Sequence, residues 1–238
     1  MTALRDSRWS GIDDDDARGR LVARPSAPTL RIAPGLHALG LSSGRDALLY
    51  VPPSYDMRTP APLAVMLHGA GGDASHGMSL LRVFADEAGL VLLAPSSRGA
   101  TWDLLLDDFG PDVEFIDAAL DAASERCAID PERVAIGGFS DGASYALSLG
   151  LSNGDLFTHV LAFSPGFMAP AARIGSPRCY VSHGVGDTVL PIARCSRHIV
   201  PALERHGYEV RYREFDGAHV VPADIAREAL DWIAPIAR

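Results

Sequence analysis

Short apolar segments recur along this 238-residue chain, and they constrain its fold more than any other feature. Several are continuously apolar rather than alternating, which is typical of strands buried on both faces of a sheet. They lie at residues 47–51, 63–67, 90–94, 133–137, 159–163, 179–183 and 209–215. A sheet built from such strands needs a covering layer on each face.

Helix-like segments separate these apolar runs and supply that cover. Residues 78–88 and 113–126 form two of them, and 222–237 forms a third that opens with Pro222, a residue suited to a first helical turn. Strand and helix alternating in this way predict an α/β fold with a mostly parallel sheet and helices on both faces.

The chain has no internal linker, repeat or low-complexity block that would divide it after its first residues. We expect a single domain over residues 29–238. Residues 1–28 are polar, acidic and proline-bearing, with a run of four aspartates at 13–16, and predict a flexible tail.

Charge and hydropathy narrow the class of partner. The chain carries 21 basic and 30 acidic residues, a net charge of −9, which disfavours nucleic acid and anionic membranes as partners. No apolar run reaches the ~18 residues that predict a membrane span. The first residues lack the apolar core of a signal peptide, which predicts a cytoplasmic location and leaves secretion of a longer precursor open.

The three cysteines, Cys127, Cys179 and Cys195, are an odd number at no metal-ligand spacing. We expect buried, inert thiols in a reducing compartment, with a Cys179–Cys195 disulfide left open. The histidines and carboxylates form no metal-binding motif such as HExxH, so we expect neither a metal nor a cofactor.

Ser140 stands in the pattern G-x-S-x-G, between Gly138 and Gly142, after an apolar run and before a small-residue segment. A reactive serine must project from the edge of the sheet on a sharp strand-to-helix turn, and flanking glycines relieve the crowding there. The motif alone is short enough to occur in an ordinary turn, so its meaning depends on the rest of the chain.

A base and an acid follow in the order that such a serine needs. Serine becomes a nucleophile when a histidine takes its proton, and a carboxylate holds that histidine in the right tautomer. Asp187 follows one predicted strand and His219 follows the next. Asp216 is a rival acid, although its place on the same loop as His219 disfavours it.

A glycine-rich loop after the run 63–67 offers donors for an oxyanion. The backbone N–H groups of Ala70 and Asp141 are the expected pair, the second lying directly after the serine. The same loop matches a loose dinucleotide-binding pattern, but the next strand ends without the acidic residue that would hold a ribose, which disfavours that alternative.

With these residues in place, the sequence resembles the α/β-hydrolases. It is similar to the phospholipase/carboxylesterase group of serine esterases and to the related feruloyl-esterase and polyhydroxybutyrate-depolymerase-like proteins. The segments that carry the resemblance are YVPPSY (50–55), LHGAGGD (67–73), GFSDG (138–142), GVGDTVLP (184–191) and GAH (217–219).

The resemblance implies Ser140 as nucleophile, Asp187 as acid and His219 as base, with the amides of Ala70 and Asp141 as the oxyanion hole. The carboxylesterase group usually has glutamine after the nucleophile, where this chain has Asp141. The implied reaction is hydrolysis of a small-molecule ester through an acyl-enzyme. Aromatic or polymeric esters, thioesters, a peptidase and a catalytically dead binding protein of the same fold stay open.

The 46 residues between Ser140 and Asp187 leave no room for a large cap domain. Two strands and two helical links should fill this stretch, so we expect an open, shallow pocket that favours short acyl groups. Trp102, Phe167 and Met168 are candidates to line it, with core packing as the alternative. The sequence leaves the physiological ester and the oligomeric state, including a homo-oligomer, open.

Overall fold

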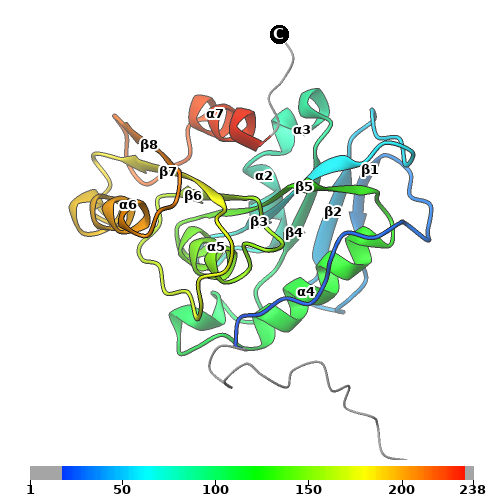
Figure 1. Cartoon of the computed structure of the whole chain (residues 1–238), viewed down its shortest axis with the longest axis horizontal. Helices are drawn as coiled ribbons and strands as arrows, with labels where there is room; N and C mark the ends of the chain where they lie inside the picture. The colour runs from blue at the N-terminus through cyan, green and yellow to red at the C-terminus, as the bar shows by residue number, and fades with distance from the viewer. Residues whose placement is uncertain (1–17, 234–238) are drawn as a thin grey trace, which may run out of the picture.

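Eight strands form one sheet in the computed structural model, which describes residues 18–233 (Figure 1). Their order across the sheet is β1-β2-β4-β3-β5-β6-β7-β8. The strands are β1 (Gly35–Ala38), β2 (Ala47–Val51), β3 (Ala61–Leu67), β4 (Val91–Pro95), β5 (Ile129–Phe139), β6 (His159–Phe163), β7 (Arg178–Gly184) and β8 (Val210–Phe215). β2 pairs antiparallel with β1 and β4, and all other neighbours are parallel. The predicted, mostly parallel sheet is confirmed.

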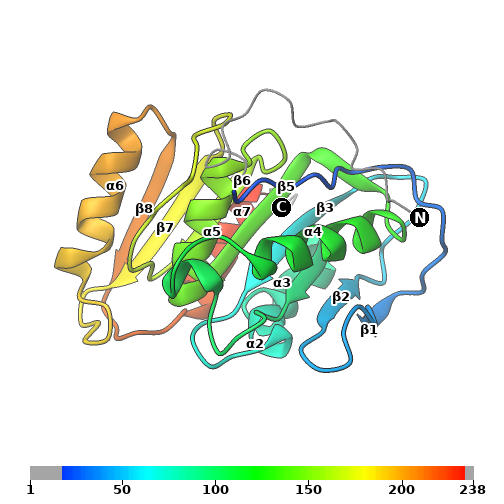
Figure 2. The same cartoon turned by 90° about the horizontal axis from the view of Figure 1, so that it is seen from below.

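Helices cover both faces of this sheet (Figures 1 and 2). α2 (Ala74–Ser79), α3 (Arg82–Ala88) and α7 (Ala223–Ile233) lie on one face. α4 (Pro111–Ser124), α5 (Asp141–Ser152) and α6 (Ser196–Arg205) lie on the other, and two short 3₁₀ turns occupy Asp103–Leu105 and Ile192–Arg194. The carboxyl ends of the parallel strands therefore meet at one edge, where loops can bring polar side chains together.

Two predicted helices differ from the structure. The helix expected over 78–88 is two helices, α2 and α3, and the second helical link expected between Ser140 and Asp187 is absent. The chain between β6 and β7 instead runs as a loop that contains three prolines, which cannot donate helical hydrogen bonds. The Ser144 and Ser148 hydroxyls of α5 accept from the Gly166 and Ala169 amides at 2.9 Å and fix the loop.

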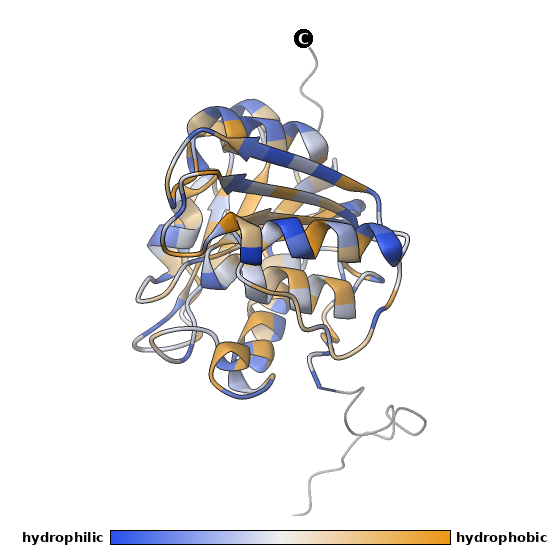
Figure 3. Ribbon diagram, turned by 90° about the vertical axis from the view of Figure 1, so that its left-hand side faces the viewer, coloured by the Kyte–Doolittle hydropathy of each residue, from blue (hydrophilic) through white to orange (hydrophobic). Residues whose placement is uncertain are grey.

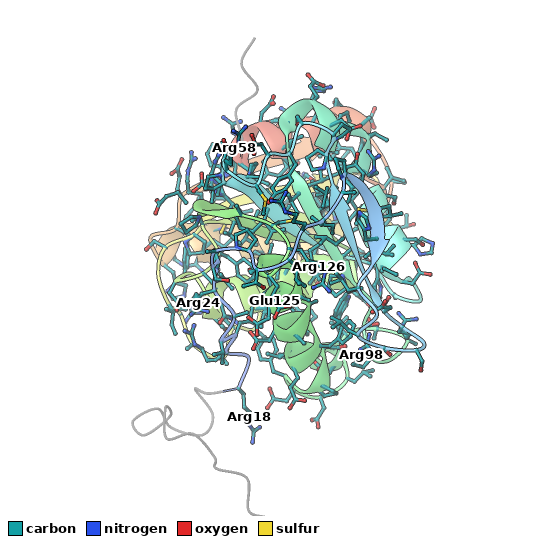
Figure 4. All side chains as sticks on the ribbon, turned by 90° about the vertical axis from the view of Figure 1, so that its right-hand side faces the viewer. Arg18, Arg24, Arg58, Arg98, Glu125 and Arg126 are labelled. Carbon is teal, nitrogen blue, oxygen red and sulfur yellow. The ribbon has the colours of Figure 1, made fainter. Side chains whose placement is uncertain are left out.

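The segment from residue 18 to 28 corrects the expected tail. Leu21 and Ala23 are buried, and the amides of Val22 and Ala23 donate to Asp117 of α4 at 2.7 and 2.8 Å. Figure 4 shows Arg18 and Arg24 on this segment, which runs beside α4 toward Glu125 and Arg126 at its far end. The domain boundary predicted at residue 28 is therefore wrong for 18–28, while the aspartate run at 13–16 lies outside the described residues.

The edge strand β8 is the polar border of the sheet. Three of its six residues are charged, and Figure 3 shows it largely hydrophilic beside the more apolar strands. Charged side chains on an edge strand disfavour pairing with another sheet. Within residues 18–233, no helix has the length and apolar character needed to cross a membrane.

The three cysteines are free and buried, so the open Cys179–Cys195 disulfide is not formed. Burial raises the pKa of the Cys127 and Cys179 thiols to about 12. Because the thiolate is the reactive form, both thiols are inert near neutral pH, as the sequence predicts.

His159, at the start of β6, makes the fold sensitive to acid. It is 6% exposed, its Nε2 has no hydrogen-bond partner among the described residues, and burial, followed by the charge of Arg178, lowers its pKa to about 4. In the unfolded chain a histidine titrates near ~6.5. The unfolded state therefore binds the extra proton first, and stability falls as the pH drops from about 6.5 toward 4.

The free energy of unfolding should fall between pH 7 and pH 4.5, and we expect this fall to be smaller by about 2.5 kcal/mol in His159→Gln than in the wild type. Urea unfolding of both proteins at the two pH values measures this difference. His206→Gln, at an exposed histidine, is the control and should change it little. An equal pH dependence in wild type and His159→Gln would contradict the buried, neutral state of His159.

Candidate active site

Ser140 occupies a sharp turn at the carboxyl edge of the sheet, between β5 and α5. Its backbone has φ 57° and ψ −119°, a strained conformation for a residue other than glycine. A Cβ at Gly138 would lie 2.5 Å from Gly142 backbone atoms, and one at Gly142 would lie 2.4 Å from the His68 carbonyl oxygen. The two glycines are needed because the turn packs this closely against itself and the end of β3.

A continuous hydrogen-bonded chain joins Ser140, His219 and Asp187. His219 Nε2 lies 2.8 Å from Ser140 Oγ, and its Nδ1 lies 2.6 Å from Asp187 Oδ2. A carboxylate only accepts, so Nδ1 carries the proton and Nε2 can accept the one on Oγ. Asp216, the alternative acid, is exposed and makes no hydrogen bond to His219.

Asp187 is held rigidly below the imidazole. Its Oδ1 accepts from the amides of Val189 and Leu190 at 2.9 and 2.8 Å. Burial works to raise the pKa of Asp187, but the Leu190 amide, His219 and the Val189 amide together outweigh it and hold the pKa below its usual value. The group is therefore a carboxylate aimed at His219 Nδ1 throughout the neutral range.

A second histidine, which the sequence analysis does not single out, contacts the same carboxylate. His183, fully buried in β7, places Nε2 3.2 Å from Asp187 Oδ2 and 2.7 Å from the Leu190 carbonyl oxygen, while Nδ1 lies 2.7 Å from Ser196 Oγ. Two acceptors at Nε2 require that nitrogen to be the protonated one. Burial lowers the pKa of His183, so this histidine is neutral and positions Asp187 by contact with its Oδ2. Its spacing of four residues before Asp187 is the sequence signal.

The loop after β3 carries Ala70 and lies against the turn at Ser140, where a Cβ at Gly69 would be 3.4 Å from Ser140 Cβ. Gly71 takes a left-handed conformation, with φ 69°, and its amide donates to the Ala100 carbonyl at 2.7 Å. Among the described residues, neither the Ala70 amide nor the Asp141 amide has a hydrogen-bond partner. The Asp141 amide also belongs to the first turn of α5, where backbone donors are free to bind an anion.

The unusual carboxylate of Asp141 is already engaged. Its Oδ2 accepts a hydrogen bond from Thr101 Oγ1 at 2.6 Å. The side chain therefore ties the start of α5 to the loop after β4, and a carboxylate in the first turn is favoured by the helix dipole.

Trp102 does not line a substrate pocket, contrary to one expectation. It is fully buried, stacks on His68 and Tyr145 with ring centroids 4.7 and 5.1 Å away, and donates from Nε1 to the His68 carbonyl at 2.9 Å. The indole N–H finds this partner only because β3 and the 96–102 loop lie side by side. Trp102 supports the loop that carries Ala70.

The other two pocket candidates lie on the loop between β6 and β7. Phe167 and Met168 are half-buried, and Met168 packs against the core between the sheet and the α4–α6 layer. Near them Leu190 lies 3.4 Å from the Cβ position of Gly166. Both side chains lie partly exposed on the loop that is fixed to α5. Their contact with a substrate stays a prediction.

One apolar pocket that the sequence did not indicate opens beside His219. It has a volume of about 390 Å³ and is formed mainly by α3, α7, Phe139 and the residues after His219. Phe139 packs on the His219 ring with centroids 4.5 Å apart. The apolar residues directly before Ser140 and after His219 are the sequence signal for this pocket. The residues from α3 that complete it are distant from them in sequence.

No group of three or more histidine, cysteine, aspartate or glutamate side chains within residues 18–233 is placed to hold a metal. The chemistry available at the site is instead that of a hydroxyl, an imidazole and a carboxylate in series. Such a series can transfer a proton from the hydroxyl as it attacks an electrophile.

This fold, with its serine at the turn after β5, is that of the α/β-hydrolases. The chain belongs to the phospholipase/carboxylesterase family, whose model matches residues 111–234, just over half of its length. The expected family resemblance is confirmed.

Curated relatives of this chain are esterases. A probable feruloyl esterase C of Aspergillus niger is 30% identical over 172 residues, which cover 69% of this chain and 61% of the relative. A putative esterase, NocK, of Nocardia uniformis subsp. tsuyamanensis is 30% identical over 171 residues, 68% of this chain and 44% of the relative. The chain thus spans about three-fifths or less of these relatives.

Solved structures support the same fold. A phospholipase/carboxylesterase from Dyadobacter fermentans has a TM-score of 0.62 at 22% identity, covering 79% of this chain and 95% of that one. A ferulic acid esterase from Anaeromyces mucronatus, in complex with ferulic acid, has a TM-score of 0.61 at 19% identity, covering 80% and 84%. At this level of identity the likeness establishes the fold.

Proposed function

We propose that the protein is a serine carboxylesterase that hydrolyses esters of short carboxylic acids through an acyl-enzyme. The observation that carries the proposal is the hydrogen-bonded chain from Ser140 Oγ through His219 to Asp187 Oδ2. Membership of the phospholipase/carboxylesterase family supports the same class of reaction.

In the first half-reaction, Ser140 Oγ attacks the ester carbonyl carbon and its proton passes to His219 Nε2. Asp187 stabilises the imidazolium that forms. The carbonyl oxygen becomes an oxyanion, and the unpaired amides of Ala70 and Asp141 are its proposed donors. His219 then gives its proton to the alcohol oxygen as the carbon–oxygen bond breaks, and the acyl group stays on Ser140.

In the second half-reaction, water replaces the alcohol. His219 takes a proton from the water as it attacks the acyl carbon, and returns that proton to Ser140 Oγ when the acid leaves. The neutral His183 and the two backbone amides keep Asp187 in place in both halves. No cofactor enters this sequence of steps.

Esters of aromatic acids are the second candidate. Relatives named as feruloyl esterases favour it, and the half-buried Phe167 lies on a loop fixed to α5. Thioester and peptide cleavage use the same three residues, so they are competing reactions to be measured beside the ester. A binding protein without activity would hydrolyse none of these substrates.

The acyl preference should be short. Between Ser140 and Asp187 the chain forms α5, two strands and the loops that join them, with no cap to enclose a long chain. Each buried methylene contributes about 0.8 kcal/mol, and those beyond an open pocket contribute nothing because they stay in water. We expect kcat/KM to peak at roughly two to six acyl carbons.

The acyl preference is tested by initial rates on p-nitrophenyl acetate, butyrate, octanoate and palmitate. The competing reactions are tested beside them with methyl ferulate, an acyl thioester and a peptide anilide. The rate should show no jump when an ester passes its micelle point. A maximum at octanoate or beyond, or activation at a lipid interface, would contradict the open site. A larger kcat/KM for methyl ferulate would favour the aromatic candidate.

A further inference from the structure

The apolar pocket beside His219 has no part in the proposed reaction as described so far. It is lined by Leu80, Val83 and Phe84 from α3 and the turn before it, by Phe139, and by Val220 and Val221. His219 itself forms one wall, whereas Ser140 and the two proposed oxyanion residues do not line the pocket. The pocket is therefore continuous with the imidazole and set apart from the acyl-bearing oxygen.

Its position selects one half of the ester. His219 Nε2 must lie within hydrogen-bond distance of the alcohol oxygen to protonate it, while the acyl carbon is bonded to Ser140 Oγ. Because His219 also forms a wall of the pocket, a group attached to the alcohol oxygen is the part of the ester best placed to enter it.

Its chemistry selects the kind of alcohol. Apart from His219, the pocket has one polar side chain, Ser79, whose hydroxyl already donates to the His76 carbonyl at 2.7 Å. A sugar entering here would lose water from its hydroxyls and meet mostly apolar side chains, which is unfavourable. Val83 and Val220, 75% and 49% exposed, would gain from apolar cover.

We propose that this pocket binds the alcohol portion of the ester, and that the preferred alcohol is apolar and of the size of one aromatic ring or a short alkyl chain. The inference rests on the proposed esterase function. A volume of about 390 Å³ lies at the small end of the ~300–1,000 Å³ range of ligand pockets, which suits a group of that size.

Acetate esters test this because the acyl group stays constant. We expect kcat/KM to rise from methyl to butyl to 2-phenylethyl acetate, by about tenfold or more overall, since each fully buried methylene is worth about fourfold. Xylose and glucose acetates should be hydrolysed no better than methyl acetate. Ser140→Ala should abolish hydrolysis of all of them.

Val83→Asn is the matched variant, because it places a polar, uncharged group on the rim of the pocket. It should reduce the ratio of kcat/KM for 2-phenylethyl acetate to that for methyl acetate by roughly threefold or more, close to the effect of one buried methylene. Val22→Asn changes an exposed valine on the α4 side of the molecule and should leave the preference intact.

The failures can be told apart. A flat profile, or a preference for sugar acetates, that still depends on Ser140 overturns the alcohol pocket and leaves the esterase proposal standing. Equal losses of preference in Val83→Asn and Val22→Asn also overturn it. Failure of the wild type to hydrolyse any acetate, thioester or aromatic ester overturns both proposals.

Discussion

Ser140→Ala is expected to lower kcat for p-nitrophenyl acetate by about 10⁴-fold or more, because within residues 18–233 Ser140 Oγ is the hydroxyl that is hydrogen-bonded to His219 Nε2. Alanine removes only the Oγ atom, whose one bond is to His219, and the backbone turn is fixed by its glycine neighbours. The fold should therefore survive. Steady-state kinetics and thermal unfolding of the same preparation measure the two effects.

Ser43→Ala is the control for that change, since Ser43 is exposed on the loop between β1 and β2. It should keep wild-type turnover. Retention of wild-type kcat by Ser140→Ala would show that Ser140 is not the nucleophile. A large loss of thermal stability would show that its Oγ has a structural role instead.

Asp187→Asn is expected to lower kcat by about 10⁴-fold. The amide can turn its N–H₂ group toward His219 Nδ1, which then accepts and leaves the proton on Nε2, the nitrogen that must receive it from Ser140. The amide oxygen can still accept from Val189 and Leu190, so the loop should keep its shape. The kcat of Asp187→Asn on p-nitrophenyl acetate measures the effect.

Asp216→Asn is the comparison, because Asp216 is three residues before His219 yet exposed. It should retain most of the wild-type kcat. A larger loss in Asp216→Asn than in Asp187→Asn would make Asp216 the orienting acid and contradict the geometry on which the mechanism depends.

The parts of the molecule that could be predicted are those governed by local pattern. Continuous apolar runs indicated the buried strands. Ser140, Asp187 and His219 follow three of the parallel strands, β5, β7 and β8, and were expected at one edge because parallel strands end together. The glycines beside Ser140 were interpretable because crowding at such a turn depends on backbone alone.

The parts that could not be predicted depend on contacts between distant segments. The sequence leaves Trp102 open between lining the pocket and packing in the core, and the structure places its ring in the core with its N–H on the His68 carbonyl. The pocket beside His219 combines Val83 with Val220, which are 137 positions apart (220 − 83). A polar composition also hid the packing of Leu21, whose amide donates to Asn153 at 2.8 Å.

The central claim is that Ser140 Oγ is the nucleophile that carries the acyl group in the acyl-enzyme. Labelling by a fluorophosphonate tests this claim most directly. The reagent transfers its phosphonyl group to an activated serine Oγ with loss of fluoride, and peptide mass spectrometry locates the bond. The account predicts one adduct per chain, on the peptide that contains Ser140, formed in step with loss of esterase activity and much more slowly in Asp187→Asn. Full activity in the presence of the reagent, or inactivation with the adduct on a different residue, would contradict it.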